Sequence, residues 1–259
     1  MSCLPPSGRI NCTLCHAAPV EFNRTRMVSD GWRITANPLA WGNSRPEVLI
    51  LGFSKGPNAV DALGKKPHDQ IPYAGQRANV GKILAHCKLI RGNSPSDIRG
   101  AVDRAIEDQA GRFGWGSLVR CTVERYDGTV WKGSGGGMLD KFMATPFGQR
   151  VTKNCATQYL GDLPLETKLV VLFGLGTKLG YVTAARKVLA QARPSASWRA
   201  FNDVAYTDGR VMFVHVEHFA AQGSLIPDWL GIPDKLGRVS ARARWGQQAQ
   251  AAIGAALPT

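Results

Sequence analysis

The chain has 259 residues, 44% of them apolar and 20% charged, which is the composition of a folded globular protein and excludes an intrinsically disordered chain. The chain has 32 Lys and Arg and 19 Asp and Glu, which gives a net charge of +13. Such a charge is typical of proteins that bind the phosphate backbone of nucleic acids, although some basic enzymes share it. No apolar run approaches membrane-spanning length and residues 2–10 lack a signal-peptide core, so we expect a cytoplasmic protein with no membrane partner.

The N-terminal segment 1–30 is polar and contains a C-x-x-C pair, Cys12 and Cys15. Residues 31–46 predict a short edge strand, and the unbroken apolar run 48–51 predicts a strand buried on both faces of a parallel sheet. This run ends in the loop 52–58, whose two glycines and proline let the backbone turn sharply. Ligands of open α/β sheets bind beyond the carboxyl ends of the strands, so we expect this loop to form the floor of a site.

Further elements follow in alternation. We predict helices over 79–90, 94–109, 138–160 and 181–192, and strands over 116–121, 168–174 and 211–216. Between them we expect a long functional loop over 59–78 and a flexible glycine-rich excursion over 126–138, and the chain ends in a basic helix or tail over 238–259. This order predicts an α/β protein in which residues 1–259 form one three-layer α/β/α domain with a mainly parallel central sheet.

Two histidines lie in or near the last predicted strand. His218 follows its end, so it would face the same side as the loop 52–58 and donate a hydrogen bond to charge developing on a substrate. The alternative is a histidine that caps the next segment. His215 lies inside the strand and fits buried structure better.

The collinear order of these motifs resembles the uracil-DNA glycosylase superfamily, nearest its iron–sulfur-containing, thermophile-type branch. The motifs are C-x-x-C, strand-G-x-x-x-G, Pro-Tyr-Ala-Gly before a helix, strand-Arg-Cys, a cysteine in a helix, an apolar strand ending in Phe-Gly, and strand-x-x-His. The resemblance extends from Cys12 to about Leu230.

The resemblance implies a cofactor. Cys12, Cys15, Cys121 and Cys155 fall at the positions that bind a [4Fe–4S] cluster in that branch. On ligand chemistry alone a tetrahedral zinc site fits four thiolates equally well, and unpaired buried thiols are a further alternative. The gap between Cys121 and Cys155 is longer than the family usually has, which the glycine-rich excursion explains.

The resemblance also implies a mechanism in which a base is flipped into a pocket and its N-glycosidic bond is cut. Tyr73 takes the place of the aromatic residue that stacks on the base, and His218 would stabilise the departing base. Gly52 and Gly56 would let backbone amides approach the departing base.

Several positions depart from the family pattern. Phe53 and Ser54 stand where the family loop carries a carboxylate or amide that positions water, and Asn58 or Asp61 is the expected substitute, with Asp69 a further possibility. Ser117 replaces a base-reading asparagine, and it offers only part of an amide's hydrogen-bonding pattern. Phe219 and Ala220 replace the proline and serine that usually follow the histidine.

The leading hypothesis is a DNA N-glycosylase that excises uracil or another deaminated or modified base from single- or double-stranded DNA and so initiates base-excision repair. The alternative is a catalytically impaired nucleic-acid-binding relative. An α/β hydrolase or nucleotide-binding enzyme ranks last, because the sequence has neither a G-x-S-x-G elbow nor a phosphate-binding G-x-x-x-x-G-K-[ST] loop.

Overall fold

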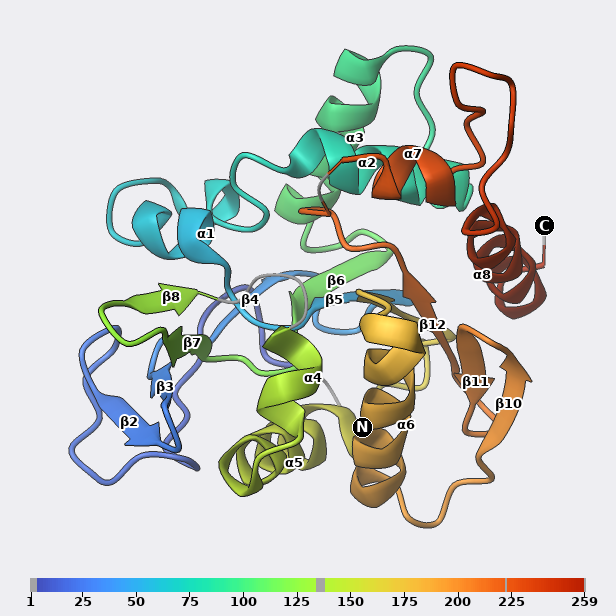
Figure 1. Ribbon diagram of the computed structural model, residues 1–259. Helices are drawn as coiled ribbons and strands as arrows, with labels where there is room; N and C mark the ends of the chain where they lie inside the picture. The colour runs from blue at the N-terminus through green and yellow to red at the C-terminus, as the bar shows by residue number, and fades with distance from the viewer. Residues whose placement is uncertain (1–3, 134–137, 222, 259) are drawn as a thin grey trace.

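A computed structural model describes residues 4–133, 138–221 and 223–258 (Figure 1). The main sheet of this part of the chain contains β1 (Gly8–Arg9), β4 (Leu39–Gly42), β5 (Val48–Gly52), β6 (Phe113–Ser117), β9 (Leu169–Phe173), β10 (Arg199–Asn202), β11 (Ala205–Thr207) and β12 (Met212–Val216). Their order is β1-β4-β6-β5-β9-β12-β11-β10. The central strands β6, β5, β9 and β12 pair in parallel, and the strands outside them pair antiparallel.

The predicted α/β class is confirmed. All residues of β5 and β9 are buried, as the unbroken apolar runs predicted for strands covered on both faces. The sheet is mixed, however, because antiparallel strands extend both edges. On one side these are β1 and β4, of which β4 lies in the segment 31–46 predicted to hold a short edge strand, and on the other side they are β11 and β10, which the sequence did not predict.

Helices lie on both sides of this sheet. They are α1 (Pro57–Ala62), α2 (Arg77–His86), α3 (Pro95–Glu107), α4 (Met138–Met143), α5 (Pro146–Leu160), α6 (Gly180–Ala192), α7 (Leu225–Trp229) and α8 (Ala243–Ala256), with 3-10 turns at His68–Gln70 and Thr177–Leu179. In Figure 1, α2, α3, α7 and α8 are on one side and α4, α5 and α6 on the other. No helix in the described part of the chain is long and apolar enough to cross a membrane.

A second sheet contains β2 (Arg26–Ser29), β3 (Trp32–Thr35), β7 (Thr122–Tyr126) and β8 (Trp131–Gly133), all antiparallel. It corrects the prediction of a flexible excursion over 126–138: residues up to 133 form the β7–β8 hairpin, and 134–137 lie outside the described residues. The hairpin is stabilised by Asp127, whose Oδ1 accepts the backbone N–H groups of Thr129 and Val130 at 2.9 Å each.

Other predicted boundaries shift for local reasons. The strand predicted over 116–121 is β6, which ends at Ser117, and the loop predicted over 59–78 begins in α1 and contains the turn His68–Gln70. The helix predicted over 138–160 is interrupted before Pro146, where Thr145 Oγ1 caps α5 by accepting the Gly148 N–H at 2.9 Å. The C-terminal helix begins at Ala243, so residues 238–242 precede it.

Candidate functional site

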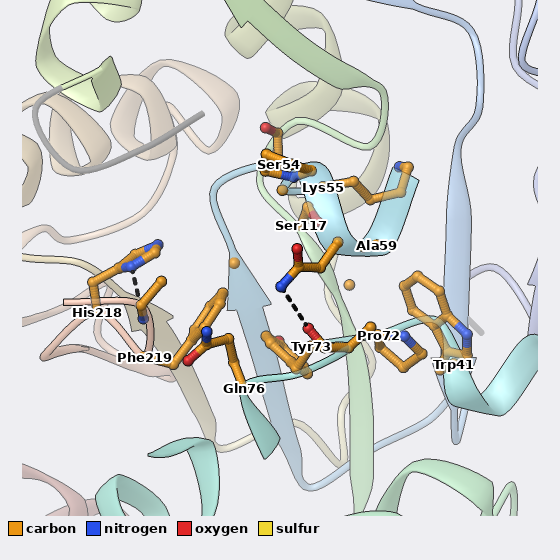
Figure 2. A pocket seen from close by; sticks show the side chains of 17 residues that line it. Trp41, Ser54, Lys55, Ala59, Pro72, Tyr73, Gln76, Ser117, His218 and Phe219 are labelled. Atoms are coloured by element: carbon orange, nitrogen blue, oxygen red, sulfur yellow. Dashed lines mark hydrogen bonds between the residues drawn. The ribbon is translucent and has the colours of Figure 1, made fainter. Parts of the chain in front are cut away.

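A cavity of about 130 Å³ lies at the carboxyl ends of the central strands. Its lining comes from the loop after β5, the segment before α2, the end of β6 and the segment after β12: Trp41, Gly52, Ser54, Lys55, Gly56, Pro57, Asn58, Ala59, Pro72, Tyr73, Ala74, Gln76, Gly116, Ser117, His218, Phe219 and Ala220. Figure 2 shows His218 and Phe219 on one side of the cavity and Pro72 and Trp41 on the other. The sequence therefore placed the loop after β5 correctly at the floor of a cavity.

Strand pairing explains why distant segments meet here. Gly52 and Ser117 are register partners at the ends of the parallel strands β5 and β6, and the pairing continues where Leu118 N–H donates to Gly52 O at 2.8 Å. His218 lies two residues beyond the end of β12, which runs parallel to them. The backbone at Gly56 borders open space, because a Cβ there would meet no atom within 4 Å.

Aromatic rings form one wall. The Tyr73 and Phe219 rings meet edge to face with centroids 4.9 Å apart, and both contact Phe173 at the end of β9. Tyr73 adopts a left-handed φ of 55°, which is strained for a bulky residue and points to a position fixed by its surroundings. Burial raises the pKa of Tyr73, so its phenol stays neutral. Such a wall suits the stacking of a planar ring.

His218 is neutral at physiological pH, because burial lowers its pKa to about 4. Its Nδ1 accepts the backbone N–H of Ala220 at 3.2 Å, so the ring proton is on Nε2 (Figure 2). His218 is therefore a neutral hydrogen-bond donor at the cavity. His215, by contrast, is fully buried in β12 and hydrogen-bonds to Tyr206 Oη and Gly174 O at 3.0 Å each, as expected of a structural residue.

The position of His218 depends on a buried ion pair. Glu217 is 3% exposed; its Oε1 accepts the His218 N–H at 2.9 Å, and its Oε2 accepts from Arg242 Nε at 2.5 Å. Arg242 precedes α8, so the basic C-terminal segment anchors the loop that carries His218.

We expect Arg242→Ala to lower the free energy of unfolding by about 3 kcal/mol, because it leaves the Glu217 carboxylate buried and unpaired. Urea unfolding of wild type and variant measures the effect. The matched control is Arg238→Ala, which breaks the exposed pair with Asp234 and should change stability by no more than about 0.5 kcal/mol. Equal effects of the two substitutions would show that the buried pair carries no special stability.

Besides His218 and Lys55, the cavity lining includes four aliphatic side chains that carry a hydroxyl or an amide: Ser54, Asn58, Gln76 and Ser117. Asn58 Nδ2 donates to Ala74 O at 3.3 Å, which leaves its Oδ1 to meet a ligand or water. Gln76 was not among the residues expected from the sequence, and Phe219 was expected only as a departure from the family pattern. Gln76 directly follows the Pro-Tyr-Ala-Gly segment, so its place beside that motif was the available signal.

Three predicted residues are not at the cavity. Phe53 does not line it; its ring packs against Phe142 and Tyr181, with centroids 5.8 and 5.9 Å away, on the side of α4 and α6. Phe53 was expected with Gly52 and Gly56 to contact the substrate, but its side chain lies in the core instead. Asp61 is exposed on α1 and Asp69 lies in the following 3-10 turn, and neither lines the cavity.

The four cysteines of the predicted cluster gather where the N-terminal loop, the end of the β6–β7 connection and α5 meet. Asn154 Nδ2 donates to Cys15 Sγ at 3.4 Å, Tyr159 hydrogen-bonds with Cys12, and the Arg120 N–H donates to Cys155 Sγ. Burial is the main cause that raises the pKa of Cys121 to about 11 and of Cys155 to about 12, and the proximity of Cys12 and Cys15 is a smaller cause in the same direction. The thiols therefore lie within electrostatic reach of one another, and those of Cys121 and Cys155 stay protonated unless a metal binds.

The spacing of these thiols bears on the metal they could bind. Among residues 4–133, 138–221 and 223–258, no three His, Cys, Asp or Glu side chains are grouped closely enough to bind one ion. Tetrahedral zinc needs its four sulfurs about 3.8 Å apart. The described residues thus contain no preformed single-ion site at these thiols.

No protein-family model matches the sequence, and no curated protein matches it either. The fold and the site define the structural class of the protein, which is an α/β protein with a mixed sheet. A neutral histidine and an aromatic wall lie at a cavity on the carboxyl ends of its parallel strands, and a group of thiols lies behind that cavity.

Proposed function

We propose that this protein is a DNA N-glycosylase that flips a deaminated or modified base into the cavity, cuts its N-glycosidic bond and so initiates base-excision repair. The observation that carries the proposal is the convergence of Gly52, Ser54, Ser117 and His218 with the Tyr73–Phe219 wall at one cavity. The net charge of +13 supports a nucleic-acid substrate.

The proposed roles follow from the geometry. A flipped base stacks on the aromatic wall, and Ser117 and Gln76 hydrogen-bond to its edge. Nε2–H of His218 donates to the negative charge that develops on the departing base, which a neutral imidazole in a desolvated site can stabilise without losing a proton. Asn58 Oδ1 or the Ser54 hydroxyl positions the attacking water.

Among the described residues no carboxylate lines the cavity. This observation favours a second candidate function, a catalytically impaired relative that binds DNA and flips or senses a base without cutting it. In the glycosylase proposal, the same observation means that water is positioned by an amide or hydroxyl, and that catalysis depends mainly on stabilising the leaving base.

We further propose that Cys12, Cys15, Cys121 and Cys155 bind a [4Fe–4S] cluster, with zinc as the alternative. The donor set fits such a cluster: four buried or half-buried thiols, no disulfide among them, and two buried cations beside them. When bound, the cluster would supply a structural cross-link and a contact to DNA, and it takes no part in bond cleavage. Free thiols fit a cytoplasmic location, and the helices on both sides of the sheet fit a single three-layer domain.

The test is incubation with single- and double-stranded oligonucleotides that contain uracil, hypoxanthine, xanthine or only normal bases, followed by alkali and by measurement of released base. A glycosylase yields alkali-labile breaks and free base from at least one damaged substrate and none from normal DNA. Salt-sensitive DNA binding without any released base supports the impaired relative instead. A chain that neither binds nor cleaves these substrates contradicts both.

A further inference from the structure

Two buried cations lie between the cavity and the thiols. Lys55 is 5% exposed; it lines the cavity, and its Nζ donates to the backbone oxygen of Arg120. Arg120 is 2% exposed and lies behind the cavity floor so closely that a Cβ on Gly116 would come within 1.7 Å of its Nη1. Glycine at position 116 is what admits this guanidinium.

Neither cation has a carboxylate partner. The ion pairs within residues 4–133, 138–221 and 223–258 include neither Lys55 nor Arg120. Arg120 Nη1 donates only a long hydrogen bond of 3.4 Å to Leu39 O, and its Nε is buried without a partner. Burying an unpaired charge is strongly unfavourable and lowers the pKa of both groups, so an anion nearby would stabilise the two cations.

The ionisable groups beside these cations are thiols and the phenols of Tyr73 and Tyr159, and of these the thiols are the ones that metal binding deprotonates. Cys121 directly follows Arg120, Cys155 accepts the Arg120 N–H, and both thiols interact electrostatically with Lys55. The Arg120 guanidinium also lies 5.3 Å from the centre of the Tyr159 ring, which contacts Cys12. The two cations thus face the thiol cluster from the side of the cavity.

We infer that Lys55 and Arg120 are the counter-charges of an anionic iron–sulfur centre at Cys12, Cys15, Cys121 and Cys155, and that they raise its reduction potential. The inference rests on the cluster proposed above. An oxidised [4Fe–4S] core with four thiolates carries a net charge of about −2, which two cations balance. One-electron reduction at an electrode makes the centre more negative and neither forms nor breaks a bond, so nearby buried cations favour the reduced state.

The experiment compares wild type with Lys55→Met, Lys55→Arg and Arg120→Gln after anaerobic purification. Iron and sulfide are assayed, folding is checked by circular dichroism, and the midpoint potential is measured by protein-film voltammetry. The matched control is Lys82→Met, which removes an exposed lysine of α2. We expect Lys55→Met and Arg120→Gln to shift the potential to more negative values, and Lys55→Arg and Lys82→Met to keep it near that of wild type.

Loss of iron from folded Lys55→Met while Lys55→Arg retains it also supports the inference, because charge is then needed to keep the centre. An unchanged potential in loaded Lys55→Met and Arg120→Gln overturns the inference and leaves the cluster proposal intact. Loss of iron from both Lys55 variants overturns it as well, because packing rather than charge would be decisive. Wild type that contains zinc or no metal overturns both.

Discussion

Replacing His218 with alanine is expected to lower the single-turnover rate of base excision by about 10²–10³-fold. The substitution removes the neutral Nε2–H donor that faces the charge developing on the departing base. Affinity for DNA should hardly change, because the phosphate contacts of a protein with a net charge of +13 lie outside this one side chain. Single-turnover cleavage and fluorescence anisotropy on the same oligonucleotide separate the two effects.

Two further measurements identify the role of the ring. His218→Gln restores an N–H donor and should recover part of the rate, and His86→Ala, which removes a ring that packs on Trp229, should leave it unchanged. Because the pKa of His218 is lowered to about 4, the ring is neutral in the range from pH 5 to 8. The cleavage rate of the wild type should therefore show no change near pH 6.5 that reports titration of a histidine. A rate that persists undiminished in His218→Ala would rule out the assigned role.

Replacing Cys155 with serine is expected to lower bound iron at least about tenfold and to abolish the brown absorbance near 400 nm. The side chain is buried in α5, so the loss of the metal link should also lower the free energy of unfolding by roughly 3 kcal/mol or more. Iron assay, absorbance and urea unfolding measure the three effects.

Cys87→Ala is the matched control. Cys87 is also buried, but it follows α2 and belongs to the hydrophobic core, and no interaction between it and the other thiols influences its pKa. Its replacement should reduce stability slightly and leave iron content unchanged. Equal loss of iron from both variants would show that the metal is not bound at the proposed thiols.

The parts of the fold that depend on local sequence were predictable. Strands β5, β9 and β12 consist mainly of apolar residues, many of them branched, which favours strands buried on both faces. Helix α3 begins at a Ser-Pro pair whose serine caps it. The second sheet was not predictable in this way. Arg33 in β3 pairs with Glu124 in β7, 91 residues away, and neither short strand has a strong hydrophobic pattern of its own.

The candidate site shows the same division. Its place at the carboxyl ends of the strands follows from β-topology, and so the loop after β5 and His218 could be named from sequence. The sequence could not show which side chains of these segments face the cavity. Successive residues point to opposite sides of a strand and of its extension, so a shift of one residue changes the answer. Ser54 lines the cavity, while its neighbour Phe53 lies in the core.

The sequence by itself determined the α/β class, the parallel centre of the sheet and the residues that leave its carboxyl edge, because these depend on unbroken apolar runs and on turn chemistry. Only the tertiary structure decided that the four thiols gather behind the cavity with Lys55 and Arg120 between them. Burial of an unpaired cation is governed by what surrounds it in space, and no spacing of residues along the chain reveals that environment.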